Sequence, residues 1–278
     1  MLNIRMRFPG FKFKAFTMSY DDGATHDIRL IETMERYGVK GTFNLNSKFL
    51  TNTYNGWYIT PEQALETYKN QEVAAHGAYH LALKGLDSAL IADEILINRK
   101  DLEKLFGRVV KGMAYAYGSY DQEVEAVLKT CGIVYSRTTG NVDDFSLPAD
   151  WLAWHATCHH ANPRLGELTD NFLALDGNDP RTHLHFPKLF YVWGHSYEFD
   201  REKNWDLLEG LLEKVSGKED IWYATNGEIY QYAEDFKRLQ FSANCEWVFN
   251  PTAQDIFFLA NGKEIVAKSG ETTRINEQ

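Results

Sequence analysis

The sequence contains few cysteines and no long apolar run, and both absences narrow the class of protein. Its 278 residues include three cysteines, Cys131, Cys158 and Cys245. An odd number of widely spaced cysteines indicates isolated thiols in a reducing compartment, not a disulfide framework. No stretch approaches the roughly 18 apolar residues of a membrane-spanning helix, and the N-terminal residues lack the apolar core of a secretory signal. We therefore expect a cytoplasmic protein with no membrane partner; the alternative is a secreted protein whose signal peptide has been removed from this sequence.

Basic residues are also fewer than acidic residues. The chain has 29 Lys and Arg residues against 39 Asp and Glu residues, which gives a net charge of -10. An average field of this sign repels polyanions, so we expect no nucleic-acid partner. Aromatic residues are plentiful by contrast, with 15 Tyr and 7 Trp. They leave aromatic surface for a sugar-like or flat polar ligand.

Strand-like segments alternate with helix-like segments along most of the chain. The strand candidates are Phe13–Tyr20, Gly41–Leu45, Glu72–His76, Gly112–Tyr117, Ile133–Arg137, Trp151–Ala156, Leu189–Gly194 and Ile221–Thr225. Helix signals lie between them: Thr60 precedes a Pro at the first helical position, and Asp87 opens a long helix that Gly107 ends. This alternation predicts an α/β fold with a parallel sheet, which is a (β/α) barrel if closed and a doubly wound fold if open. The chain length favours the barrel.

The pattern changes after Phe241. Three β-rich segments follow, Glu246–Phe249, Asp255–Ala260 and Lys263–Ala267, and an Asn-Gly turn separates the last two. We therefore expect two units: a (β/α) barrel over residues 1–240 and a short C-terminal β-hairpin extension over residues 241–278, packed on the barrel.

Polar clusters follow four of the predicted strands, where parallel α/β folds place their chemistry. They contain Asp21 and Asp22, the pair His76 and His80, Tyr117, and the segment His195–Glu198. Each cluster alone is compatible with an ordinary turn or a core histidine. The two histidines are four residues apart, the spacing that places both rings on one face of a helix. Together, two carboxylates and two histidines predict a three-ligand divalent metal site with one carboxylate left over, as in hydrolytic Zn²⁺ sites.

These motifs resemble those of the polysaccharide deacetylases, which remove acetyl groups from chitin-like and peptidoglycan sugars. Ser19–Gly23 resembles the family's Thr-Phe-Asp-Asp-Gly motif, and His76–His80 resembles its His-Ser/Thr-x-x-His motif. Ala114–Gly118 stands in the place of Arg-x-Pro-Tyr-Gly, and Trp193–His195 in that of Leu-x-His. The order and spacing of the four motifs, from about Phe13 to His195, carry the resemblance.

The resemblance implies a distorted (β/α) barrel of seven or eight strands and a metal-dependent hydrolase. It places one divalent ion, Zn²⁺ or else Co²⁺ or Ni²⁺, on three ligands: Asp22, His76 and His80. It makes Asp21 the general base that takes a proton from water. The backbone N–H of Tyr117 would help to hold the oxyanion, and His195 would protonate the departing amine or alcohol.

The sequence departs from the family pattern at several positions. Ala114 replaces an Arg that pairs with the catalytic Asp in the family, Gly77 replaces a hydroxyl residue, and Asp150-Trp151 only echoes the fourth motif. Arg137 ends the strand next to the one that carries Ala114, so we expect it to form an ion pair with Asp21 in place of the missing Arg. The alternative is that Arg137 points outward into solvent.

A patch rich in Trp and His offers further candidates for contacting or orienting a substrate. The candidates, together with Arg137, are Trp151, Trp154, His155, His159 and Glu198. The patch is also compatible with an aromatic core and solvated histidines. We expect a hydrolase that removes acetyl groups from an N- or O-acetylated carbohydrate. The alternatives are a hydrolase of a non-carbohydrate amide on the same fold and a non-catalytic carbohydrate-binding relative.

Overall fold

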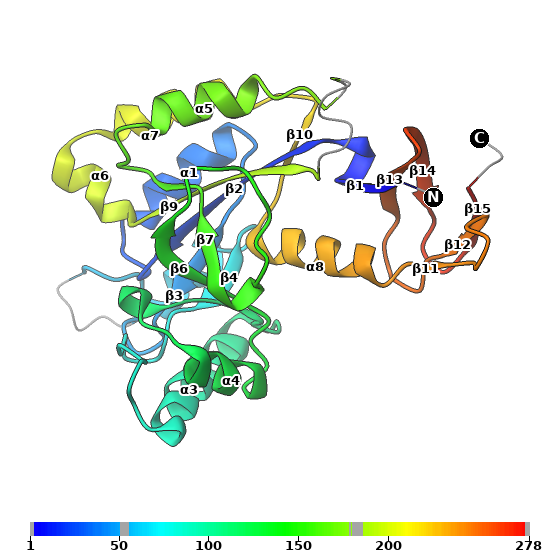
Figure 1. Ribbon diagram of the computed structural model, residues 1–278. Helices are drawn as coiled ribbons and strands as arrows, with labels where there is room; N and C mark the ends of the chain where they lie inside the picture. The colour runs from blue at the N-terminus through cyan, green and yellow to red at the C-terminus, as the bar shows by residue number, and fades with distance from the viewer. Residues whose placement is uncertain (1–2, 51–55, 178, 180–185, 276–278) are drawn as a thin grey trace.

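The computed structural model describes residues 3–50, 56–177, 179 and 186–275, and a parallel β-sheet lies at its centre (Figure 1). The strands of this sheet are β2 (Lys14–Asp21), β3 (Thr42–Leu45), β4 (Glu72–Ala75), β5 (Gly112–Ala114), β6 (Tyr135–Asn141), β7 (Trp154–Ala156), β8 (Cys158–His159), β9 (Lys188–Gly194) and β10 (Ile221–Tyr223). Neighbours follow the order β7-β6-β5-β4-β3-β2-β9-β8, and β10 pairs with β2.

Two short strands close this sheet into a ring. β7 and β8 belong to one extended segment, in which only Thr157 separates them. β7 pairs in parallel with β6, whereas β8 pairs in parallel with β9. Because β9 pairs along nearly the whole length of β2, the ring returns to its first strand. The predicted barrel is therefore confirmed.

The barrel is distorted at β2. β10 pairs with the first half of this strand, at Lys14–Phe16, and β3 pairs with its end, at Ser19–Asp21. Two strands thus share one edge of β2, and β10 is a partial eighth strand. Every residue of β2 is buried, as expected for a strand covered on both faces.

Helices cover the outside of the barrel (Figure 1). They are α1 (Asp27–Arg36), α2 (Pro61–Thr67), α3 (Ser88–Phe106), α4 (Gln122–Thr130), α5 (Leu165–Leu173), α6 (Ser196–Glu202), α7 (Trp205–Val215) and α8 (Asn226–Lys237). α2 begins as predicted, because the Thr60 side chain accepts a hydrogen bond from the backbone of Gln63. α3 also has its predicted ends: Asp87 caps its first turn, and Gly107 ends it in the left-handed conformation, with φ of 64°.

The C-terminal strands form two small antiparallel sheets beside α8. The predicted hairpin is present as β13 (Ile256–Ala260) and β14 (Lys263–Ala267), joined at Asn261-Gly262, where both residues have positive φ. The N-terminal strand β1 (Ile4–Arg7) pairs with β13, which the sequence pattern did not predict. β11 (Gln240–Phe241), β12 (Trp247–Phe249) and β15 (Thr272–Arg274) form the second sheet. The division into a barrel over residues 1–240 and an extension over residues 241–278 stays a proposal. β1 lies in the first range but pairs with β13 in the second.

Two further features of the fold are its cysteines and the apolarity of its helices. Cys131, Cys158 and Cys245 are all free thiols, as predicted, and the first two are buried. None of the helices in the described part of the chain combines the length and the apolarity that a membrane crossing requires.

Candidate active site

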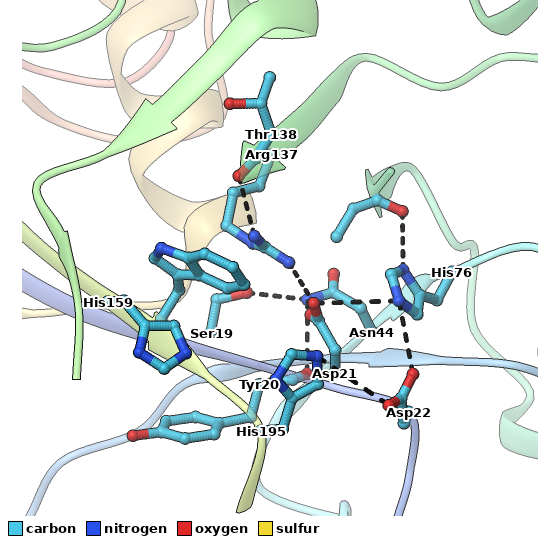
Figure 2. A network of polar contacts seen from close by, with 12 residues as sticks. Ser19, Tyr20, Asp21, Asp22, Asn44, His76, Arg137, Thr138, His159 and His195 are labelled. Atoms are coloured by element: carbon cyan, nitrogen blue, oxygen red, sulfur yellow. Dashed lines mark hydrogen bonds and ion pairs between the residues drawn. The ribbon is translucent and has the colours of Figure 1, made fainter. Parts of the chain in front are cut away.

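The predicted catalytic and metal-ligating residues meet at the carboxyl ends of the barrel strands, and Figure 2 shows four of them, Asp21, Asp22, His76 and His195. β2 ends at Asp21 and β4 just before His76, while His195 follows β9 directly. Arg137 lies on β6, on the far side of Asp21 from the histidines (Figure 2). Strands that are distant in the sequence thus bring the acidic, imidazole and guanidinium groups together.

Three donor atoms converge on one point. Asp22 Oδ1 lies 3.5 Å from His76 Nε2 and 3.5 Å from His80 Nε2. A tetrahedral ion with ligands at about 2.0–2.1 Å holds its donor atoms about 3.3–3.4 Å apart. Asp22 Oδ1 is also buried and has no hydrogen-bond partner within the described residues. Since a buried carboxylate oxygen without a partner is costly, this donor set fits a divalent cation.

The ring of His76 is oriented for metal binding. Its Nδ1 lies 2.8 Å from the carbonyl oxygen of Ala114, so Nδ1–H donates to that carbonyl. The lone pair of Nε2 is then directed toward Asp22. Asn98 fixes the backbone beneath the ring, because its Oδ1 accepts the N–H of His76 at 3.0 Å.

The segment from His76 to His80 is a loop and not a helix, so the prediction of one helical face is wrong. His80 has a φ of 60°, and Gly77 a φ of 82°. The buried carboxylate of Glu94, on α3, shapes this loop: its Oε1 accepts the N–H of Tyr79 at 2.8 Å and of Leu81 at 3.2 Å. A Cβ atom at Gly77 would lie 2.5 Å from that same oxygen, which explains the glycine at this position.

We expect Glu94→Ala to weaken metal binding by about 10–100-fold, the usual cost of losing a residue that supports metal ligands. The variant leaves two N–H groups beside His80 without an acceptor, so the second histidine is no longer held in place. Competition with a chromophoric chelator measures the affinity. Asp93→Ala is the matched control, because Asp93 is the exposed neighbour of Glu94 on α3. Equal affinities for the Glu94 and Asp93 variants would contradict the assignment.

Asp21 is buried and ionised. Its Oδ1 accepts a hydrogen bond from Asn44 Nδ2 at 2.8 Å, and its Oδ2 forms an ion pair with Arg137. Burial raises the pKa of Asp21, but the charges of Arg137, His76 and His195 outweigh burial and bring the pKa down to about 2. Asp21 is thus an anion at neutral pH, held between a guanidinium on one side and imidazoles on the other.

Arg137 takes the orientation that pairs it with Asp21, so the alternative of an outward side chain is wrong. The side chain is fully buried. Its guanidinium carbon lies 4.2 Å from the ring centre of Trp193, and its Nη1 donates to the carbonyl of Thr138 at 2.8 Å. A positive charge therefore stands beside Asp21 although position 114 is an alanine.

A second polar cluster surrounds Glu198, in the first turn of α6. Glu198 Oε2 lies 3.1 Å from His159 Nε2, 3.3 Å from His160 Nε2 and 3.5 Å from His195 Nδ1. His159 Nδ1 accepts the backbone N–H of Ala161 at 3.0 Å, so its proton sits on Nε2 and points at Glu198. This is the opposite tautomer to that of His76. The Glu198 cluster is therefore arranged as a hydrogen-bonded anion, although the donor atoms of His159, His195 and Glu198 also lie close enough together to hold a metal ion.

His195 links the two clusters. Its Nε2 lies 4.0 Å from Asp22 Oδ2 (Figure 2). Its Nδ1 lies 3.5 Å from Glu198 Oε2. Burial lowers the pKa of His195, but the carboxylates of Glu198, Asp21 and Asp22 outweigh it, so the pKa lies above its usual value. The ring is thus stabilised in its protonated form.

The remaining candidates from the sequence are Tyr117, Trp151, Trp154 and His155. Tyr117 lies at the site, with φ of 58° and its ring 4.5 Å from that of His80. Trp154 is buried against Tyr135 and Tyr191 and offers no surface to a substrate. Trp151 Nε1 donates to Glu234, and the exposed His155 contacts Thr138.

His160 was not among the candidates, although it contacts Glu198. It is buried, and its ring stacks against those of Tyr20 and Phe199. A Cβ atom at Gly194 would lie 2.1 Å from His160 Nδ1, so the glycine before His195 makes room for this ring. A histidine directly after a short strand gave no local signal of such packing.

The polysaccharide deacetylase family model matches residues 10–136 of this chain. No curated protein matches this chain. Among solved structures, a protein from Mycobacterium smegmatis assigned to the polysaccharide deacetylases has a TM-score of 0.62 at 15% identity, over 84% of this chain and 94% of that one. The CE4 domain of a multidomain xylanase from the hindgut metagenome of Trinervitermes trinervoides has a TM-score of 0.53 at 16% identity, over 80% and 91%.

A third similar structure is a mutant, with restored activity, of a CE4 family pseudoenzyme from Bacillus anthracis. It has a TM-score of 0.50 at 17% identity and covers 81% of this chain and 70% of that one. Because the sequence identities are low, the similarity to these structures shows the fold of the chain alone.

Proposed function

We propose that this divergent member of the polysaccharide deacetylase family is a metal-dependent hydrolase that removes acetyl groups from an N- or O-acetylated carbohydrate. The observation that carries the proposal is the buried, unpartnered Asp22 Oδ1 facing the Nε2 atoms of His76 and His80, with the separate carboxylate of Asp21 beside them. One carboxylate is thus available for a metal and the other for a proton. Zn²⁺ is the ion that best suits two imidazoles and a carboxylate, and Co²⁺ and Ni²⁺ are alternatives.

When bound, a divalent ion supplies Lewis acidity, which makes water more acidic and polarises the acetyl carbonyl. Asp21 accepts the proton of the attacking water, because it is ionised and its Oδ2 lies 3.9 Å from His76 Nε2, at the edge of the donor set. Arg137 and Asn44 hold the Asp21 carboxylate in this orientation. The backbone N–H of Tyr117 donates to the oxyanion as charge develops on the former carbonyl oxygen.

The second proton transfer belongs to His195. As the bond between the acetyl carbon and the sugar breaks, His195 Nε2 donates its proton to the departing nitrogen or oxygen. Glu198 stabilises the protonated ring through Nδ1 and fixes the backbone, since its Oε2 also accepts the N–H of His195 at 3.2 Å. His159 donates to the same carboxylate from the other side and completes the support.

Acetate release tests the proposal. The purified protein is stripped of metal, reloaded with Zn²⁺, Co²⁺ or Ni²⁺, and assayed on N-acetylglucosamine oligomers, O-acetylated xylo-oligomers and acetylated non-carbohydrate amides. We expect acetate from at least one sugar series, dependent on the added metal. Acetate from the non-carbohydrate amides alone would favour the amide-hydrolase alternative. Sugar binding without acetate release from any metal form would identify a non-catalytic relative.

A further inference from the structure

Exposed aromatic side chains are placed around the site, although large aromatic surfaces are usually buried. The exposed fraction is 46% for Trp57, 52% for Tyr79 and 71% for Tyr117. Tyr117 holds its ring outward from a left-handed backbone, with φ of 58°, a conformation that costs energy for a residue other than glycine. The ring of Tyr117 lies 4.5 Å from that of the proposed metal ligand His80, and Tyr79 precedes His80 in the sequence.

A second aromatic pair lies on the side of the proposed acid. The ring of Tyr197 lies 5.2 Å from that of His195, and the ring of Trp57 lies 5.6 Å from that of Tyr197. Tyr197 comes from α6, whereas Trp57 comes from the segment before α2, so the two rings are brought together by the tertiary fold. The ring of His26 also lies 5.4 Å from that of Trp57, in an edge contact that supports the position of the indole. The result is a row from His195 through Tyr197 to Trp57.

The direction of the reaction decides which side receives the sugar. In deacetylation, water adds to the acetyl carbon, the bond from that carbon to the sugar nitrogen or oxygen breaks, and the sugar leaves after gaining a proton. The group that supplies the proton therefore contacts the sugar, whereas the acetyl group faces the metal ligands. His195 is that group in the function proposed above. The sugar ring must then lie beside His195, where Tyr197 and Trp57 are found.

We propose that Tyr197 and Trp57 form a sugar-binding platform that selects oligosaccharides over single acetylated sugars. This inference rests on the proposed function. Aromatic rings combine a large apolar face with a low conformational cost, which suits the apolar face of a pyranose. Tyr197, next to His195, contacts the unit that carries the acetyl group. Trp57, one ring further out, contacts the adjoining unit of the chain.

The test compares KM for substrates of increasing size. In Trp57→Ala, we expect KM for an acetylated trisaccharide to rise about three- to tenfold, as loss of one aromatic contact implies. The increase for 4-nitrophenyl acetate, which has no sugar, should be much smaller. Trp247→Ala is the matched control, because Trp247 is similarly exposed, at 42%, but lies on β12 in the C-terminal sheets. Its kinetics should equal those of the wild type.

A binding measurement separates this inference from the proposed function. Calorimetry with the metal-stripped protein and a deacetylated chitotriose requires no turnover, and Trp57→Ala should reduce the affinity while Trp247→Ala should not. If the protein releases no acetate but shows this difference, the proposed function fails and the platform remains. Equal losses for the trisaccharide and 4-nitrophenyl acetate, or equal trisaccharide affinities in both Trp variants, would overturn the platform. Tyr197→Ala should impair the trisaccharide and the acetylated monosaccharide alike, and an effect on neither would also contradict it.

Discussion

His80→Ala is expected to remove the divalent ion and with it the hydrolase activity. The variant loses one of three donor atoms and leaves Asp22 Oδ1 with a single imidazole neighbour. Metal affinity should fall by more than the roughly 10–100-fold that follows loss of a supporting residue. Equilibrium dialysis followed by metal analysis should give one ion per wild-type chain and none per variant chain.

The fold should survive this substitution. The barrel has an extensive apolar core formed by residues of β2, β3, β9 and the surrounding helices, so its stability does not depend on an ion. The melting temperature of the metal-free variant should equal that of the metal-free wild type. His155→Ala is the matched control, because His155 is an exposed histidine of the barrel outside the donor set. Retention of a full equivalent of metal by His80→Ala would rule out the site.

Asp21→Asn should have a different effect: the ion stays and turnover falls by about 10²–10⁴-fold, the usual contribution of acid–base catalysis. The amide is nearly the same size as the carboxylate but cannot accept a proton from water. Asp22→Asn, in contrast, should weaken the metal itself. Parallel metal analysis and acetate assays on the two variants make the comparison. Equal loss of metal from both would contradict the separate roles of these neighbouring aspartates.

Asp21→Asn should also lower the free energy of unfolding, because Asp21 forms an ion pair with Arg137. Arg137 is fully buried, so Asp21→Asn leaves its charge without a counterion, which costs about 3–5 kcal/mol for a typical buried pair. Asp21→Asn combined with Arg137→Met removes both charges and should recover most of that stability without recovering activity. Denaturant unfolding measures the three free energies. Recovery of activity in the double variant would exclude Asp21 as the base.

Arg137→Met alone should shift the pH dependence of activity. The Arg137 charge lowers the pKa of Asp21, so its removal raises that pKa. Because Asp21 must be ionised to accept a proton, the acidic limb of the pH–rate profile should then move to higher pH. Metal content should stay at one ion per chain. An unchanged acidic limb would show that Arg137 does not act on the base.

The position of Asp21 and Asp22 could be predicted from the sequence because it depends on local patterns. A buried apolar strand ends at these residues, and parallel strands of a barrel direct their carboxyl ends to one face. The pairing of Arg137 with Asp21 followed from adjacency of β5 and β6, which the order of the elements implies. The prediction for Arg137 also required the family resemblance, which marks position 114 as the place of a missing Arg.

The loop from His76 to His80 could not be predicted in the same way. A spacing of four residues suits a helix, but contacts with distant residues select the loop conformation instead, among them those of the buried Glu94 carboxylate, fourteen residues beyond His80, and of Asn98. The contacts of His159 and His160 with Glu198 likewise depend on the pairing of β8 with β9. Such contacts between distant segments leave no periodicity in the sequence.

The pairing of β1 with β13 has a consequence for how the chain matures during synthesis. Ile4 and Ala260 are partners in this sheet, so β1, once it has left the ribosome, must wait until the barrel strands and β13 have been synthesised. At roughly 5–20 residues per second, that interval is on the order of 10–50 seconds. All strands of the barrel emerge earlier, so the active-site end can assemble while β1 still presents an open edge. Its length of four residues and its charged Arg5 and Arg7 protect that edge from pairing with another nascent chain in the meantime.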